Sequence, residues 1–461
     1  MKRFYHQNTR RMPHLLICAL TIIVLVHTTG RAQPVTLTIE DVVVQTLRNN
    51  PELESARLEM ERSDALVKQA WGTALPSLNL DASYTRALKK PVFFLPGDFF
   101  GSPGTVRPVE IGSTNALSAA FSAKQVLFNS AVFIGVGAAN IYSEAAREQY
   151  QVSRLEYITR ARKAFYDVLV ARQILDLALQ TQTNVEANYK TVNLLAGQGL
   201  VSEYDLLRSE VTVENVKPEV INAENAYRLA LNNLKNVMAV PVETEIEVKG
   251  ELEYVPVPDS TLSSAREVML DRNPLLTSLE YQTEFTDAVV SAQKSEYLPV
   301  LSAFGNYHYD AQSNEFNSLT NDVIASSQVG LSLSLNIFNG FQTTARVEQA
   351  QIEHKKSIEL LSGTKQNLLT ATEAVLLRLN KARRRIEAQG RTVDQAARGY
   401  QIATTRYANG LGTQLEVNDA QLALVQANVN KIEAVYEYAI ASVELDQLIG
   451  QIPDYAQEEE L

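Results

Sequence analysis

Cysteine is almost missing from this chain of 461 residues, since Cys18 is its single representative. One cysteine excludes a disulfide scaffold and a thiolate metal cluster. Histidine is scarce, with five residues, and 53 acidic against 42 basic side chains give a net charge of −11. These numbers argue against a histidine-rich metal protein and a nucleic-acid binder, so we expect no metal, no cofactor and no nucleic-acid partner.

Long apolar runs and catalytic motifs are missing as well. No stretch of about 20 apolar residues occurs, which excludes a protein with several membrane-spanning helices. A β-barrel stays possible, because its strands alternate apolar and polar residues. The nucleophile-elbow, phosphate-loop and zinc-protease motifs do not occur either. We therefore expect a protein that is not an enzyme and has no catalytic residues.

The segment 1–32 has the features of a secretory signal peptide. A 12-residue apolar run, Leu15 to Val26, follows a basic segment and precedes small residues, with Gly30 and Ala32 before the expected cut. An uncleaved anchor is the alternative, but the run is shorter than the roughly 18 residues that a span needs. Removal of the segment leaves 37 basic and 53 acidic residues, a net charge of −16, and no cysteine.

The remaining chain contains two copies of a unit of about 210 residues, because four landmarks recur in one order. The pairs are 48–53 and 271–276, 75–76 and 298–299, 126–129 and 336–339, and 199–206 and 410–417. Their near-constant offsets of 223, 210 and 211 residues predict that both copies fold alike.

Each copy contains two segments that alternate as β-strands do. The clearest alternates apolar residues with small or polar ones from Val329 to Ile337. A half-buried sheet in a soluble sandwich would give the same pattern. Tyrosines at the loop-side strand ends favour an aromatic girdle in a membrane, and they are Tyr84, Tyr307 and Tyr309.

Very long helices are expected after each strand pair, over 131–196 and 341–408. About 66 residues form a helix of about 100 Å, which must pack against other long helices. A coiled-coil seam is expected at Leu368, Val375, Leu379, Ala382 and Ile386.

Both long helices end in a glycine turn, at 196–199 and 409–412, and then reverse. Capping boxes, Ser202 with Asp205 and Thr413 with Glu416, are expected to start the return helices. Pro218 should kink the first of them.

These patterns divide the chain into eight segments. They are the signal peptide 1–32, N-terminal helices 33–76, strands 77–128 with an extracellular loop 88–114, a helical hairpin 129–240, a linker with helices 241–298, strands 299–338 with an extracellular loop 310–326, a second hairpin 339–450, and an acidic tail 451–461.

The whole chain after the signal peptide resembles the outer-membrane efflux protein family, the TolC-type channel-tunnels. The resemblance rests on the Asn-Pro and Leu-Pro landmarks, on 127–129 and 337–340, and on the two hairpin tips. The most specific motif is Tyr407-x-x-Gly410-x-x-Thr413-x-x-Glu416-x-x-Asp419-Ala420.

Four strands cannot close a barrel, and lipid does not tolerate open sheet edges, so several chains must pool their strands. The resemblance implies an α+β membrane protein in which a homotrimer forms a 12-stranded β-barrel and a 12-helix α-barrel. It implies a location in the outer membrane of a Gram-negative bacterium, reaching into the periplasm.

The resemblance also implies a passive exit duct for small molecules in a tripartite pump, with a periplasmic adaptor, an inner-membrane pump of RND type and outer-membrane lipid as partners. Type I protein secretion is one alternative, and a periplasmic helical scaffold without a pore is another.

Residue roles at the tips are carried over by position. The aperture group comprises Asp205, Tyr407, Glu416 and Asp419, and the adaptor-docking group comprises Gly199, Leu200, Ser202, Gly410, Leu411 and Thr413. Glu416 and Asp205 also suit plain helix capping, which favours Asp419 as the pore carboxylate. A basic latch residue of the family is replaced by Gly412, so Arg208 is considered as a substitute partner.

Overall fold

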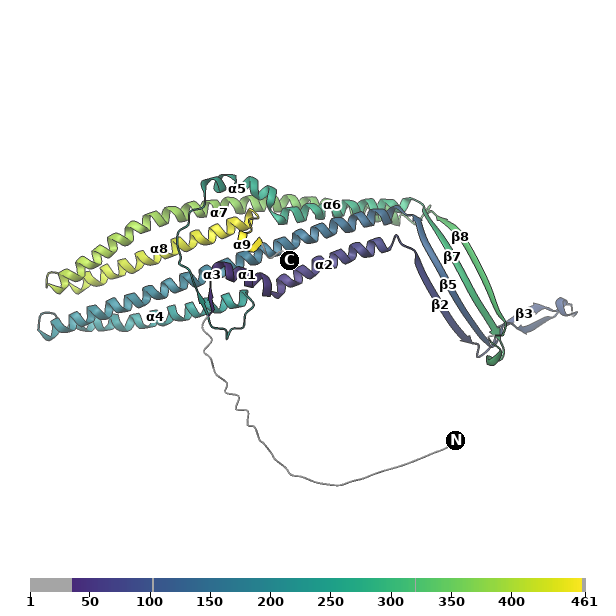
Figure 1. The fold of residues 1–461 in the computed structure, drawn as a ribbon, viewed down its shortest axis with the longest axis horizontal. Coiled ribbons are helices and arrows are strands. Elements are labelled where there is room, and N and C mark those ends of the chain that lie inside the picture. Colours follow the sequence, from purple (N-terminus) through teal and green to yellow (C-terminus); the bar gives the residue numbers. More distant parts are fainter. Residues whose placement is uncertain (1–34, 102, 320, 458–461) are drawn as a thin grey trace, which may run out of the picture.

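The computed structural model describes residues 35–101, 103–319 and 321–457, and the predicted signal peptide lies outside them. The molecule is elongated, with a sheet at one end and two long helical hairpins at the other (Figure 1). Within the described residues, no helix is both long and apolar enough to cross a membrane.

Two copies of one unit follow each other, as the repeated landmarks predicted. The first copy contains α1 (Ile39–Asn49), α2 (Pro51–Gly72), β2 (Ser77–Arg86), β5 (Asn115–Phe128), α3 (Ser130–Gly197) and α4 (Glu203–Val237). The second contains α5 (Asp259–Arg272), α6 (Pro274–Lys294), β7 (Val300–Ser313), β8 (Val323–Ser334), α7 (Gln342–Ala408) and α8 (Gln414–Leu448). Short strands β1 (Val35–Leu37) and β6 (Ile246–Val248) pair in parallel and link the start of the chain to the linker.

The Asn-Pro landmark has the same structural role in both copies. Asn50 caps α2 by accepting bonds from two backbone N–H groups, while its amide donates to the Val237 carbonyl at 3.2 Å. Asn273 caps α6 in the same way and donates to the Leu448 carbonyl at 2.8 Å. Each asparagine therefore ties the start of one helix to the end of the return helix in the same copy.

The main sheet has the strand order β2-β5-β7-β8 and is antiparallel throughout. Its register aligns the predicted apolar positions across all four strands: Leu80 lies opposite Phe121, Phe121 opposite Tyr307, and Ala303 opposite Leu331. The structure confirms one apolar and one polar face, and strands β2 and β8 form the two open edges.

The hairpins pack in the middle of the molecule around two cores, and the first core also contains Val435 and Ala439 of α8. Val375, Leu379 and Ala382 of the predicted seam are buried in the second core, together with Tyr438 and Leu445. The structure thereby confirms the seam between α7 and α8. The helix α4 continues through Pro218, so this proline does not end it, and the kink stays a prediction.

Three segments differ from the prediction. The segment 88–114 contains a second hairpin, β3 (Val92–Pro96) and β4 (Val106–Glu110), with the 3-10 helix η1 (Gly97–Phe100) at its turn. Strands β7 and β8 extend into 310–326, which shortens that loop. The C-terminal segment forms α9 (Asp454–Gln457), and its Ala456 is buried in the first core.

Candidate functional site

The first hairpin tip is a fixed turn between α3 and α4. Gly199 has a φ of +71°, and the Leu200 N–H donates to the Leu195 carbonyl at 2.9 Å, which closes the end of α3. Ser202 accepts the Asp205 N–H at 3.1 Å and donates its hydroxyl to the Asp205 carboxylate at 2.7 Å. The Asp205 carboxylate is thereby held at the start of α4.

The second tip repeats this turn between α7 and α8. Gly410 has a φ of +73°, and the Leu411 N–H donates to the Arg406 carbonyl at 2.9 Å. Thr413 accepts the Glu416 N–H at 3.2 Å. At both tips the N-cap hydroxyl therefore accepts a backbone N–H three residues later, as predicted for a capping box. The Asp205 carboxylate bonds to Ser202, whereas the Glu416 carboxylate faces Arg406.

Arg406 is the tip residue that the sequence analysis missed. Its guanidinium donates to the Leu411 carbonyl at 3.0 Å and lies 3.9 Å from the Glu416 carboxylate. A Cβ at Gly412 would lie 3.1 Å from that carboxylate and 3.3 Å from the Tyr407 nitrogen. The turn therefore leaves little room for a side chain at position 412. Arg406 supplies the basic side chain of the second tip. The only sequence signal was a basic residue in the last turn of the helix.

Tyr407 lies inside the chain, between the two hairpins. It is 5% exposed and packs with Val192 of α3 and Val417 of α8. Burial raises the pKa of its hydroxyl, and the nearby Asp205 carboxylate raises it further. Among the described residues its hydroxyl has no hydrogen-bond partner. Tyr407 therefore belongs to the packing between the hairpins, and it also lines the cleft between the two tips.

A cleft of about 660 Å³ separates the two tips. Its lining residues come from both turns, and include Leu200, Ser202, Asp205, Tyr407, Gly410, Gly412 and Thr413. Gln414 also lines the cleft with its side chain buried, and its Oε1 atom has no partner within the described part of the chain. The structure therefore brings the predicted docking and aperture residues to one end of the molecule.

The carboxylates at this end have different surroundings. Asp419 is exposed on α8, six residues after the N-cap Thr413. Glu416 faces Arg406, and Asp205 is bonded to Ser202. Arg208 is half-buried on α4. Asp419 is thus exposed and lies outside the cap, whereas Asp205 and Glu416 both belong to the capping turns.

Large apolar side chains at the tips remain uncovered. Leu200 is 67% exposed and Leu411 is 71% exposed. Further exposed apolar residues on the adjoining turns are Leu194, Tyr204, Leu207 and Leu415. A cluster of this kind is typical of a surface that binds another protein.

At the opposite end, the predicted girdle tyrosines lie on the apolar face of the sheet. The Tyr84 hydroxyl donates to Asn115 Oδ1 at 2.8 Å, and the rings of Tyr307 and Tyr309 stack edge to face with centroids 4.9 Å apart. Polar tips with apolar bodies suit a membrane–water boundary.

Further exposed aromatic residues, which the sequence analysis did not identify, lie near the junction between the sheet and the helices. They are Trp71, Phe128, Phe133, Phe338 and Phe341. Leu117 pairs with Tyr84 and Ala119 with Tyr309, so 9 to 11 residues of β5 separate the tyrosine level from Phe128. That length is about 30–36 Å along a strand and about 25 Å at the usual barrel tilt, which equals the apolar band of an outer-membrane barrel.

A family model described as "Outer membrane efflux protein" matches residues 42–240 and 266–451, which is most of the chain. The chain belongs to the outer membrane efflux protein family. This membership confirms the predicted efflux function and outer-membrane location.

Relatives and structures of this family agree with the chain over most of its length. The chain is 20% identical over 423 residues to outer membrane protein TolC of Vibrio cholerae, covering 90% of this chain and 91% of the relative. It is 23% identical over 339 residues to the alkaline protease secretion protein AprF of Pseudomonas aeruginosa, covering 72% and 69%. The outer membrane protein VceC of Vibrio cholerae has the same fold, with a TM-score of 0.77, 16% identity and coverage of 90% and 96%.

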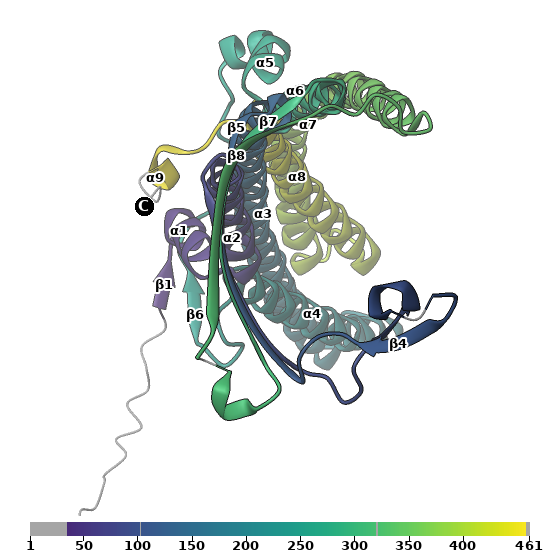
Figure 2. The same ribbon diagram turned by 90° about the vertical axis from the view of Figure 1, so that its right-hand side faces the viewer.

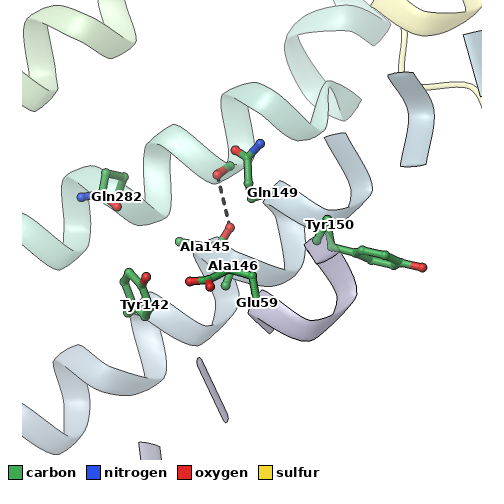
Figure 3. Close-up of a pocket in the computed structure, with 9 residues that line it drawn as sticks. Glu59, Tyr142, Ala145, Ala146, Gln149, Tyr150 and Gln282 are labelled. Carbon is green, nitrogen blue, oxygen red and sulfur yellow. Dashed lines mark hydrogen bonds between the residues drawn. The ribbon is translucent and has the colours of Figure 1, made fainter. Parts of the chain in front are cut away.

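Another hollow lies in the helical wall, between α2, α3 and α6, and has a volume of about 270 Å³ (Figure 3). Ala145 and Ala146 line it, and Ser278 donates a hydrogen bond to the Ala145 carbonyl at 3.2 Å. Within the described residues, no group of three metal-ligating side chains occurs. We interpret the hollow as a groove between the packed helices α2, α3 and α6.

Proposed function

We propose that this chain is one subunit of a homotrimer whose twelve strands close a β-barrel and whose twelve long helices form a tunnel below it. The four-stranded sheet carries this proposal. Its apolar face is exposed, with Leu331 at 70% and Leu333 at 70%, and its edges β2 and β8 are unpaired. Lipid requires those edges to be paired, and copies of the same chain supply matching edges.

The tunnel ends at the hairpin tips, where we place a ring of carboxylates. Asp419 is our preferred ring residue because it is exposed and has no cap role, and Asp205 and Glu416 lie on the same tips. Three copies would bring three Asp419 carboxylates around one axis, and such a ring attracts cations.

The tips also form the proposed docking surface for a periplasmic adaptor. Leu200 and Leu411 are exposed at equivalent positions of the two turns, so a trimer offers six similar apolar sites. The adaptor would join the tunnel to an inner-membrane pump, which we propose to be of RND type.

Small molecules are the proposed cargo, and the tunnel acts as a passive duct. The similarity to AprF, a protease secretion protein, favours type I protein secretion as the second candidate. A periplasmic scaffold without a pore is the third candidate, and the exposed apolar face of the sheet argues against it.

Conductance of the purified trimer in planar bilayers tests the pore. We expect channel events that multivalent cations block from the side of the tips. Asp419→Ala should weaken this block, while Asp259→Ala, an exposed change on α5 away from the tips, should leave it unchanged. Unchanged block in Asp419→Ala would remove this residue from the aperture, and a folded oligomer without channel events would contradict the pore itself.

A further inference from the structure

The hairpin formed by β3 and β4 carries an unusual density of exposed aromatic residues. Phe94 is 73% exposed and Phe99 is 79% exposed, and Phe93 and Phe100 are exposed beside them. Two strands alone are marginally stable in water, and both faces of this hairpin are open in the single chain. The hairpin therefore lacks a packing partner that its apolar side chains require.

The position of the hairpin indicates what this partner is. It extends beyond the ends of the four sheet strands, on the side away from the helices (Figure 1). Viewed along the molecule, it turns to the same side of the sheet as α4 and α8 (Figure 2). In the proposed trimer the helices curve around the tunnel, so the hairpin leans over its outer mouth.

The base of the hairpin is held firmly, so its direction is built into the fold. Asn314, in the β7–β8 connection, accepts bonds from Lys90 Nζ at 2.6 Å and from the Thr114 N–H at 3.2 Å. The buried Asn115 amide donates to the carbonyls of Ser313 and Asn314. These bonds tie both ends of the hairpin to the neighbouring connection.

The hairpin also continues directly from β2, the edge strand that would pair with the next copy. Proline at positions 96 and 108 removes backbone donors from its strands, which disfavours the addition of a further strand. Contact with a partner must therefore be made through side chains, and aromatic side chains are well suited to this.

We propose that the β3–β4 hairpins of three copies meet through Phe93, Phe94, Phe99 and Phe100 and form an apolar lid over the outer mouth of the channel. The occupant of each exposed aromatic surface is the hairpin of a second copy of this chain. This inference rests on the proposed trimeric pore and adds an outer constriction to the one at the tips.

Cysteine cross-linking tests the contact, because the chain has no cysteine after Cys18. Phe99→Cys should form a disulfide between chains under mild oxidation. Asn321→Cys, an exposed change in the β7–β8 connection, is the control and should stay uncross-linked. If a fluorophore on Phe99→Cys is quenched by brominated lipid and the chains do not cross-link, the hairpin lies in the membrane and the lid is wrong.

Conductance tests the effect of the lid. The double variant Phe93→Ser/Phe94→Ser should raise single-channel conductance by about twofold or more, because apolar constrictions restrict water and ions. Phe316→Ser, which changes an exposed aromatic residue of the neighbouring connection, should not. Wild-type conductance in the double variant would overturn the lid while leaving the pore intact. A folded trimer without current in every variant would overturn the pore and the lid together.

Discussion

Tyr407 shows what the packing adds to a residue role carried over by position. The motif at the second tip predicts an aperture residue, which stays a prediction, and the structure adds that the ring packs against Val192 and Val417 inside one chain. Sequence spacing placed Tyr407 at the correct tip. It could not show which face of the last helical turn points inward, because that depends on how the two hairpins lie against each other.

The Tyr407 hydroxyl gives a direct prediction. A buried polar group without a partner costs about 1–3 kcal/mol. Tyr407→Phe should therefore leave the stability of the folded protein unchanged or raise it by about 1 kcal/mol. Thermal unfolding in detergent measures this. A clear loss of stability would show that a second chain binds the hydroxyl in the assembled trimer.

Glu444 connects three long helices through charge. Its Oε1 lies 2.7 Å from Lys163 Nζ of α3, and its other oxygen bonds to Arg378 of α7. Burial raises the pKa of this carboxyl, but the two cations outweigh burial and leave the pKa below 4.5, its ordinary value. The resulting stabilisation is present above pH 4.5 and is lost as the pH falls through the folded-state pKa.

Glu444→Gln should lower the free energy of unfolding by about 1–3 kcal/mol near neutral pH, because it removes charged hydrogen bonds. The difference from wild type should shrink as the pH falls through the lowered folded-state pKa, where the wild-type carboxyl is itself protonated. Glu433→Gln is the control, since Glu433 is exposed and lies 3.7 Å from Arg385. Equal effects of the two changes would contradict the assigned role of Glu444.

At the scale of elements, local chemistry predicted the helices well and the outer hairpin poorly. Glycine turns and cap residues determine where α3 and α7 end, and those signals are local in sequence. The β3–β4 hairpin lies in a segment with several prolines, which usually indicates an irregular loop. Its pairing depends on contacts between 92–96 and 106–110 that alternation alone does not reveal.

Gly410 at the second tip allows the contribution of its positive φ to stability to be tested. Gly410→Ala places a side chain at a φ of +73° and should destabilise the protein by about 1 kcal/mol. Gly390→Ala is the control, because Gly390 lies within α7 and a Cβ there meets nothing within 4 Å. This change should stabilise by about 0.5–1 kcal/mol. Chemical unfolding measures both, and a neutral Gly410→Ala would contradict the tip geometry.

At the scale of the whole molecule, the sequence predicted the two faces of the sheet but not the aromatic residues at its helical end. Alternation identified Leu331 and Leu333 as members of one apolar face, and the register aligned them with Ala303 and Leu301. The aromatic residues at the junction between sheet and helices were missed because Trp71 and Phe133 lie on helices. They join Phe128 and Phe338 only when the chain has folded.

A charge introduced on the apolar face of the sheet should have a different effect from a charge introduced at the next residue, on the polar face. Leu331→Arg should cost about 2–4 kcal/mol because it places a charge on the lipid face. Ser332→Arg, on the polar face, should be tolerated. The fraction of chains that fold into liposomes measures both effects. Equal tolerance of the two changes would show that the apolar face does not contact lipid.

The central claim is that one chain supplies a third of a pore. Native mass spectrometry of the protein extracted from the outer membrane in detergent tests this directly, because it counts chains. We predict a complex of three identical chains that persists after mild activation in the gas phase. A folded species of one chain, or a stable complex with another number of copies, would contradict the account.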